Sequence, residues 1–588
     1  MKTPAVRDLL KGHHSLFLDA MTDFPPLTLY GADGDFTEKV VYDSEARQPE
    51  SDGSIMTVFH AHLGGTPLTM ESHCHFFPDT STLEIDGFIR NSGMEVSPFI
   101  KGPFSLCFEF DVTGICGIRT GNLYGGAQTA RIYPPNAYAY TEKDGLFYAA
   151  GGRDGRSTEE NAPYFVIRDA AENGGVVMTC EWPGRWCIYF NPPSVRGTQR
   201  YLSGGIQGAG TCFSLAPGEK AAIPRAQLLF FGKGENPFNQ YRRHFLRHMR
   251  RPIPGIIDVP PVFYNHFFNF GNQFNEEILR IEADFYAEVG CEYFVVDGGW
   301  FAKGFREGIG NWDEPDPDKF PLGLEHFADY VRSKGMRFGL WFEPEFAMEN
   351  SSWAQKYPQF YMKARFRHLC MGTENHDLLF KMQDSEARKF LLEFLAGMVE
   401  RCGIEWIRWD CNSKPGPFWD QNDPQDNYGK IQNAWCTGLF TFLDEFMERC
   451  PTVHIEACAG GGCRMDPGTL RRAHSAWMSD NAHYYPAVRR YQSGVNLFLP
   501  GYSNSVMIFS DAADNRLEFG HGHSPWEAVY AKFAGAFGCS EKSSHFTETG
   551  KLQLKQMIIE FKSVRHLLLK DFYPLFEAAS LNDYDGWE

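Results

Sequence analysis

The sequence of 588 residues lacks several features that would place it in other classes of protein. It has no surplus of basic residues: 74 acidic residues against 56 basic ones give a formal net charge of −18, which argues against a nucleic acid or an anionic membrane as the main partner. It also has no apolar run long enough to span a membrane, and residues 1–18 lack the uninterrupted apolar stretch of a signal peptide. We therefore predict a soluble protein that binds neither nucleic acid nor membrane.

The cysteines lack the spacing of a disulfide framework or a zinc site. There are 15 of them, an odd number, and none forms a Cys-x-x-Cys pair. Several lie inside apolar, strand-like runs, such as Cys107, Cys187 and Cys291. This pattern is typical of free, buried thiols in a reducing compartment. We expect a cytoplasmic protein; a secreted protein whose signal peptide has been removed is the alternative.

The length of the chain favours two or three domains. From about residue 27 to residue 231, short alternating segments are separated by glycine, which is typical of an antiparallel β-sandwich, and we assign residues 1–235 to this domain. Residues 236–251 have helical spacing with a basic face, and proline-rich turns follow them. Residues 236–259 are therefore predicted to be a linker helix.

Beyond the linker, strand, loop and helix patterns alternate, which predicts a (β/α)8 TIM barrel over residues 260–575. The helical patterns, such as residues 275–290 and 386–403, end in glycine just before the next strand. Residues 576–588 stop without a turn or a cap, and we interpret them as the start of a C-terminal β domain that is missing. Eight strands are expected, the number that a closed barrel needs: 261–267, 293–299, 338–345, 406–412, 453–461, 475–481, 495–501 and 533–538.

Acidic residues end most of the predicted barrel strands. The active sites of such barrels lie at the carboxyl ends of the strands, so these side chains are expected to meet there. One acid in such a position is most simply a solvated residue at the start of a loop, but five strands share the feature. Carboxylates that converge among aromatic side chains suit glycoside hydrolysis, which needs neither a metal nor a cofactor. The acids are Asp297, Glu343, Glu345, Asp410, Glu456 and Asp480, and tryptophans lie between them at Trp300, Trp341, Trp409 and Trp477.

A series of motifs in this part of the chain resembles glycoside hydrolase family 36, the melibiase-type α-galactosidases. The resemblance covers roughly residues 260–575, and its most specific parts are the EPE strand, the WD-x-N strand and the CxGGG loop before W-x-SD. It implies an N-terminal β-supersandwich followed by a catalytic (β/α)8 barrel. The motifs occur in the order VVDGGWF, GNWDEPDPDKFP, KGMRFGLWFEPE, WIRWDCN, EACAGGGCRMDPG and WMSDN.

The resemblance also implies roles for particular residues. It places the nucleophile on Asp410 and the general acid/base on Asp480. The neighbouring residues agree, because Arg408 on the same strand would hold Asp410 ionised, and the apolar Trp477 and Met478 would raise the pKa of Asp480. The residues that the resemblance implies for binding the sugar are Asp297, Trp300, Trp341, Asn375, Arg408, Cys458, Gly460, Gly461 and Trp477.

The sequence departs from the family pattern at four positions around the expected sugar site. Gly298 stands where the family has the second of two acids, which hold hydroxyl groups of the terminal galactose. Losing a hydrogen bond to a charged group costs about 1.5–3 kcal/mol. Arg408 replaces a lysine, Asn375 an arginine and Phe267 a tryptophan. Since the two catalytic acids are retained, these differences favour a changed sugar specificity.

The sequence therefore predicts a retaining exo-α-glycosidase that removes terminal α-linked galactose-type residues from oligosaccharides or glycoconjugates by double displacement. Specificity for N-acetylgalactosamine or galactosamine is one alternative, because the expected sugar site is altered. A transglycosylase of the raffinose-synthase kind is a second alternative, and a sugar-binding protein without activity is a third. A homo-oligomer is compatible with all of them.

Overall fold

The computed structural model describes residues 30–31, 34–35, 40–101, 104–111, 115–120, 138–140, 147–152, 154–169, 173–191, 199–206, 211–365, 378–480, 485–508, 529–530 and 532–575. Asn375 and the interpreted start of a C-terminal domain at residues 576–588 lie outside these ranges. Within them, none of the helices combines the length and the apolar character that crossing a membrane requires. The cysteines whose side chains are described are free and, except for Cys212, buried.

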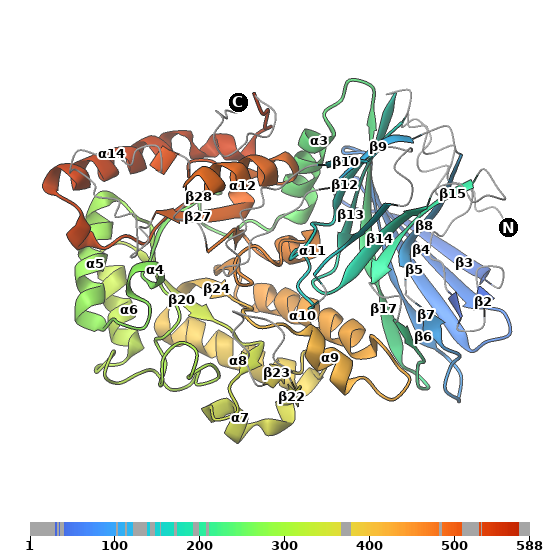
Figure 1. The fold of residues 1–588 in the computed structure, drawn as a ribbon, viewed down its shortest axis with the longest axis horizontal. Coiled ribbons are helices and arrows are strands. Elements are labelled where there is room, and N and C mark those ends of the chain that lie inside the picture. Colours follow the sequence, from blue (N-terminus) through green and yellow to red (C-terminus); the bar gives the residue numbers. More distant parts are fainter. Residues whose placement is uncertain are drawn as a thin grey trace.

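A closed barrel of eight parallel strands forms one side of the molecule, and antiparallel sheets form the other (Figure 1). This confirms the predicted fold class. Each barrel strand pairs with its neighbours in chain order, and the last strand pairs with the first. The strands are β18 (Val262–Asn265), β19 (Tyr293–Val296), β20 (Arg337–Phe342), β24 (Ile404–Trp409), β25 (His454–Ala457), β26 (Ser475–Trp477), β27 (Asn504–Ile508) and β28 (Ala536–Cys539).

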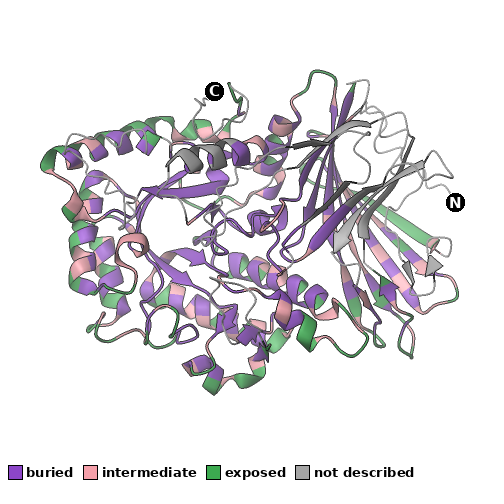
Figure 2. Cartoon of the chain, viewed as in Figure 1, coloured by how far each residue is buried: buried purple, intermediate pink, exposed green. Residues whose placement is uncertain are grey.

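Helices cover the outside of the barrel, with buried residues facing the strands and exposed residues facing outward (Figure 2). The cap residues of α5 show why these segments form helices: Asn275 accepts a hydrogen bond at its start, and Gly290 ends it with φ +107°, which favours glycine. The main helices between and after the strands are α5 (Glu276–Val289), α6 (Leu324–Ser333), α8 (Ser385–Cys402), α10 (Lys430–Arg449), α12 (Tyr485–Phe498) and α14 (Glu548–Val564), and the short α11 (Pro467–Arg471) follows β25. Shorter helices are α4 (Phe267–Phe270), α7 (Ser352–Lys356) and α9 (Gly416–Asn422).

The seventh predicted strand, at residues 495–501, is wrong. Residues up to Phe498 belong to α12, and the strand β27 begins only at Asn504. A short apolar run has the same composition in a buried strand and on the buried face of a helix, so it does not separate the two. The run is apolar because Val495 and Phe498 face the core, at 1% and 4% exposure.

The N-terminal part is built from antiparallel sheets. In the described residues the largest sheet has the order β10-β9-β12-β13-β17-β6-β5-β4-β3, and a second has the order β11-β14-β15-β8. After β17, the helix α3 (Pro237–His244) and a π-helical turn (Phe245–Met249) lead to the barrel. The strands of the two sheets are β3 (Val40–Pro49), β4 (Ile55–Leu63), β5 (Leu68–Phe77), β6 (Thr82–Asn91), β8 (Phe104–Asp111), β9 (Ile115–Thr120), β10 (Tyr138–Tyr140), β11 (Phe147–Ala150), β12 (Tyr164–Asp169), β13 (Gly174–Glu181), β14 (Trp186–Asn191), β15 (Gln199–Ile206) and β17 (Lys220–Gly232).

The β-sheet part and the barrel share one hydrophobic core. Buried residues of β12, β13 and β17 form a continuous cluster with the residues of the barrel strands. At the junction, the rings of Tyr164 and Phe498 lie 5.4 Å apart, and the hydroxyl group of Tyr164 donates to the carbonyl oxygen of Met465 at 2.9 Å. The two parts are therefore packed together and are not loosely tethered.

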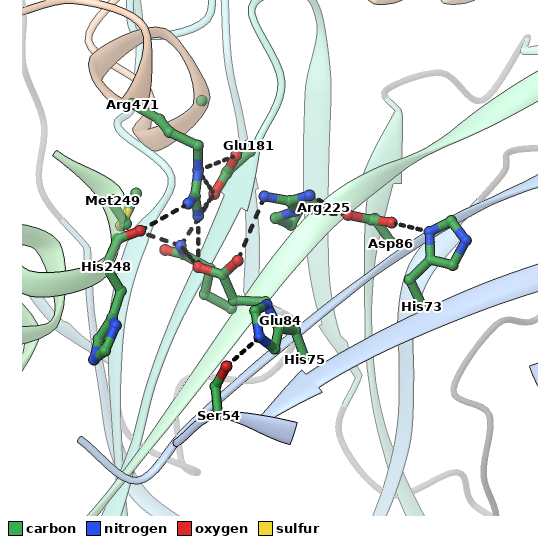
Figure 3. Close-up of polar contacts among 12 residues, drawn as sticks. Ser54, His73, His75, Glu84, Asp86, Glu181, Arg225, His248, Met249 and Arg471 are labelled. Atoms are coloured by element: carbon green, nitrogen blue, oxygen red, sulfur yellow. Dashed lines mark hydrogen bonds and ion pairs between the residues drawn. The ribbon is translucent and has the colours of Figure 1, made fainter. Parts of the chain in front are cut away.

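A buried cluster of charges reinforces this junction (Figure 3). Arg471, the last residue of α11, contacts Glu84 of β6 at 2.5 Å and Glu181 of β13 at 2.6 Å. Burial opposes the ionisation of Glu84, but Arg471, His244 and Arg225 together outweigh burial and hold the pKa of Glu84 well below its usual range. Arg471 thus supplies a positive charge that these two buried carboxylates need.

We expect Arg471→Met to lower the free energy of unfolding by about 3–5 kcal/mol, because it removes a positive charge that lies within 2.6 Å of two buried carboxylates. The matched control is Arg247→Met, which removes an exposed contact with Asp79 at 3.1 Å and should change the stability by less than about 1 kcal/mol. Urea unfolding of both variants measures the difference. Equal losses of stability in the two variants would contradict the assigned role of Arg471.

Candidate active site

The acids predicted to meet at the barrel mouth follow neighbouring strands. Asp297 follows β19, Asp410 follows β24, Glu456 lies within β25, and Asp480 comes soon after β26. Because the strands are parallel, these positions all lie at the carboxyl end of the barrel. The charges of Asp410 and Asp297 both act on the pKa of Asp480, so the structure brings the proposed catalytic pair and Asp297 into one site.

Three N–H groups surround the carboxylate of Asp410, which is only 6% exposed. The indole N–H of Trp341 donates to Oδ2 at 3.1 Å. The backbone N–H groups of Cys411 and Gly460 donate to Oδ1 at 2.8 Å and 3.1 Å. These donors fix the orientation of the carboxylate and stabilise a negative charge on it.

Asp480 has a different environment. Burial raises its pKa to about 6, and the negative charge of Asp410 adds to this effect, whereas a hydrogen bond from the indole N–H of Trp477 at 2.6 Å opposes it. Trp477 therefore acts on this pKa in the direction opposite to the one predicted from its apolar character, through its indole N–H. Near neutral pH, a carboxyl group with this pKa is protonated in a fraction of the molecules.

Arg408 contacts two buried acids, a cysteine and a tryptophan at the carboxyl end of the barrel. Its side chain is 3% exposed, its Nη1 donates to Glu456 at 3.2 Å, and its Nε lies 3.2 Å from Oδ2 of Asp297. Its Nη2 donates to Sγ of Cys458 at 3.6 Å, and the guanidinium lies over the ring of Trp477. Asp410 accepts its hydrogen bonds from the neutral N–H groups of Trp341, Cys411 and Gly460, and Arg408 acts on it through its charge.

The two acids of the EPE strand are buried in contacts of their own. Glu345 forms a two-point ion pair with Arg464, at 2.6 and 3.0 Å, and accepts the indole N–H of Trp409 at 2.7 Å. Glu343 accepts the backbone and side-chain N–H groups of Asn412. Glu343 thus fixes the backbone that follows Asp410, and Glu345 fixes the side chain of Trp409, which precedes it.

The three tryptophans that are predicted to bind the sugar have different hydrogen-bond partners within the protein. Trp300 is fully buried, and its indole N–H donates to the carbonyl oxygen of Trp341 at 2.9 Å. Trp341 and Trp477 use their own N–H groups on Asp410 and Asp480. Trp300 therefore supports Trp341, whereas the other two orient the acids directly.

Aromatic residues that the motifs did not single out line the same end of the barrel. The ring of Phe305 lies 5.6 Å from that of Trp341 and 5.1 Å from that of Phe267, and Phe268 lies 5.3 Å from Trp477. All three phenylalanines are partly exposed. Phe267 replaces a tryptophan of the family pattern, whereas Phe268 and Phe305 lie outside the motifs. Aromatic residues are frequent throughout this chain, so the sequence does not distinguish these two from the others.

The β-sheet part also contributes to this site. Thr158 donates through its backbone N–H to the carbonyl oxygen of Cys463 at 2.8 Å and through its hydroxyl to that of Gly462 at 2.7 Å. Ser157 donates to Asp466 at 2.6 Å, and Arg156 to the carbonyl oxygen of Ala459 at 3.2 Å. The CxGGG loop and the residues just after it are thus bound by residues 303 to 309 positions earlier, and no local sequence signal could have revealed these contacts.

A closed parallel barrel with acids and aromatic rings at the carboxyl ends of its strands is the architecture of a large class of glycoside hydrolases. The Melibiase family model matches residues 223–571, more than half of the chain. The chain belongs to the Melibiase family.

Curated relatives of the chain are α-galactosidases. Alpha-galactosidase Mel36A of Lactobacillus acidophilus is 30% identical over 398 residues, 66% of this chain and 52% of that protein. Alpha-galactosidase AgaA of Geobacillus stearothermophilus is 28% identical over 443 residues, 74% of this chain and 59% of that protein. The matched regions thus span about half to three fifths of these relatives.

Solved structures share the fold. The α-galactosidase of Lactobacillus brevis superimposes with a TM-score of 0.82 at 21% identity, covering 98% of this chain and 78% of that one. AgaA of Geobacillus stearothermophilus, solved in complex with stachyose, gives a TM-score of 0.80 at 22% identity, covering 94% of this chain and 78% of that one. At these identities the likeness establishes the architecture of the chain.

We expect Trp477→Phe to raise the pKa of Asp480 above about 6, because the substitution removes a hydrogen bond that stabilises the charged carboxylate. Carboxyl ¹³C NMR of protein labelled at aspartate measures this pKa as a function of pH. Trp435→Phe is the matched control, since the Trp435 indole is equally buried but donates to the carbonyl oxygen of Phe380. An unchanged or lower pKa in Trp477→Phe would show that the hydrogen bond has no such effect.

Proposed function

We propose that this chain is a retaining exo-α-glycosidase that releases terminal α-linked galactose-type residues from oligosaccharides or glycoconjugates. The observation that carries the proposal is the contrast between two neighbouring acids. Asp410 is surrounded by N–H donors that stabilise its negative charge, whereas burial raises the pKa of Asp480 to about 6. Two carboxyl groups in such different environments suit a nucleophile and a general acid.

In the proposed reaction Asp410 attacks C1 of the terminal sugar. Asp480 gives its proton to the leaving oxygen as the glycosidic bond breaks, which leaves a β-glycosyl ester on Asp410. The ionised Asp480 then takes a proton from water, the water oxygen attacks C1, and Asp410 leaves as a carboxylate. Two inversions at C1 give net retention of configuration.

We also propose that residues 260–575 form the catalytic domain, with residues 1–235 as a β-sandwich domain joined to it by the helical segment 236–259. The contacts of Arg156 and Thr158 with the CxGGG loop, and of Ser157 with Asp466 after it, support a functional part for the N-terminal domain. The α-galactosidase relatives of the Melibiase family support the choice of galactose-type substrates.

Asp410→Ala should reduce the turnover of an aryl α-galactoside by about 10⁴-fold or more, because no other group can form the ester. Asp480→Ala should also lose activity, but azide should restore turnover of a substrate with an activated leaving group.

The pH dependence of the wild-type protein gives a separate prediction. With a poor leaving group, wild-type activity should fall as the pH rises through about 6, where Asp480 loses its proton. Chromogenic assays and stopped-flow measurements give these rates.

The matched control is Asp318→Ala, which removes an exposed acid from the same half of the molecule and should keep full activity. Substantial activity of Asp410→Ala on an activated aryl glycoside would reject Asp410 as the nucleophile. If the wild-type protein binds galactose-type sugars but hydrolyses none of them, the alternative hypothesis of a sugar-binding protein without activity is supported instead. Oligosaccharide products formed at high acceptor concentration would indicate a transglycosylase.

A second candidate specificity, for N-acetylgalactosamine or galactosamine, is favoured by the surroundings of Gly298. A Cβ atom at this position would lie 2.7 Å from Cδ2 of Phe305, so an aromatic ring occupies the space where a side chain would begin. This wall of the site is therefore apolar, whereas the resemblance places there an acid that holds a galactose hydroxyl.

We expect the double substitution Gly298→Asp with Phe305→Ala to raise activity on the aryl α-galactoside relative to the α-glucoside, by about tenfold to a hundredfold, because the two sugars differ in the axial hydroxyl group that the added acid would hold. Phe305→Ala alone is the control, because it opens the space without adding an acid. A screen of aryl α-glycosides of galactose, N-acetylgalactosamine, galactosamine and glucose measures both ratios. An unchanged ratio in the double variant would show that this wall does not determine the specificity.

A further inference from the structure

A single peptide group links the proposed nucleophile to the N-terminal domain. The N–H of Gly460 donates to Oδ1 of Asp410 at 3.1 Å. The carbonyl group of the same peptide belongs to Ala459, and it accepts a hydrogen bond from Nη1 of Arg156 at 3.2 Å. The guanidinium and the carboxylate therefore lie at opposite ends of one peptide dipole.

The backbone of the CxGGG loop holds this peptide in place. Gly460 and Gly461 have φ values of +57° and +90°, which favour glycine over other residues. A Cβ atom on Gly460 would lie 3.0 Å from Nη1 of Arg156, so the loop and the guanidinium are packed against each other. The backbone N–H of Ala459 donates to the carbonyl oxygen of Gly461 at 2.9 Å, which closes the turn.

Arg156 is itself rigidly placed. Its side chain is 6% exposed, and its Nη2 donates to Oε1 of Glu159 at 2.5 Å. The segment that carries it is fixed to the barrel on both sides, because the N–H of Gly416 donates to the carbonyl oxygen of Asp154 and Thr158 binds the far end of the CxGGG loop. A buried positive charge in a fixed position acts on its neighbours through a medium of low dielectric constant.

We infer that Arg156 is a positioning residue which acts on Asp410 through the Ala459–Gly460 peptide. Its hydrogen bond to the carbonyl oxygen fixes the plane of the peptide and polarises it, which makes the Gly460 N–H a stronger donor. This donor holds the carboxylate for its attack on C1 and stabilises the negative charge that returns to Asp410 when the ester breaks. The inference rests on the proposed role of Asp410 as the nucleophile.

The competing explanation is that Arg156 only holds the two domains together. Arg185 provides the matched comparison, because it also reaches from the N-terminal domain to the barrel. It forms a two-point ion pair with Asp420 of α9, at 2.6 and 2.8 Å, and its guanidinium lies over the ring of Trp419. A purely structural role predicts similar effects of removing either arginine.

The kinetic test compares Arg156→Met, Arg156→Lys and Arg185→Met with the wild-type protein on an aryl α-galactoside. We expect Arg156→Met to lower kcat about tenfold, which corresponds to ~1.4 kcal/mol, with KM changed less than about twofold. Arg156→Lys should recover part of the loss, because it restores a positive donor, and Arg185→Met should keep the wild-type kcat. Thermal unfolding of all three variants shows whether the changes in kcat follow stability. Equal losses of kcat in Arg156→Met and Arg185→Met would overturn the inference.

A second measurement does not depend on turnover. Infrared difference spectra between each protein and its Asp410→Asn version isolate the carboxylate stretching band of Asp410. This band should shift in Arg156→Met and stay in place in Arg185→Met. An unshifted band in Arg156→Met overturns the link through the peptide, even if the protein hydrolyses no glycoside. A shifted band in a protein without hydrolase activity would retain the link and reject the proposed function instead.

Discussion

The site depends on one buried positive charge among several buried acids. Arg408 lies between Asp297 and Glu456, and its charge also acts on Asp480. Burial raises the pKa of Asp297 and of Glu456 even though Arg408 opposes this effect. Without the guanidinium, these carboxylates would lie together in a medium of low dielectric constant and could not all remain ionised. Arg408 therefore lets the closed barrel gather acids at one end.

Around this centre, each acid has its own set of neutral donors. Trp341 and two backbone N–H groups bind Asp410, and Trp477 binds Asp480. The indole groups come from the strands that carry or flank the acids, so their orientation is fixed by the β-ladder. Rigid placement of this kind matters for catalysis because small displacements of a reacting group have large effects on rate.

The two domains share the task of shaping the CxGGG loop and the helix after it. The barrel supplies the loop between β25 and α11, and the N-terminal domain binds it through Arg156, Ser157 and Thr158. The buried contacts of Arg471 with Glu84 and Glu181 hold the end of α11. The N-terminal domain is thus part of the structure that orients the proposed nucleophile.

The sequence by itself determined the class of the fold and the positions of the acids, because strand alternation, helix caps and terminal glycines act within a few residues. It failed at residues 495–501, where an apolar run fits a strand and a helix equally well. Only the tertiary structure decided the partners of each acid: neutral donors for Asp410, and Arg408 for Asp297 and Glu456. The contact between Arg156 and Ala459 joins residues 303 positions apart, a pairing set by how two domains pack and not by any local pattern.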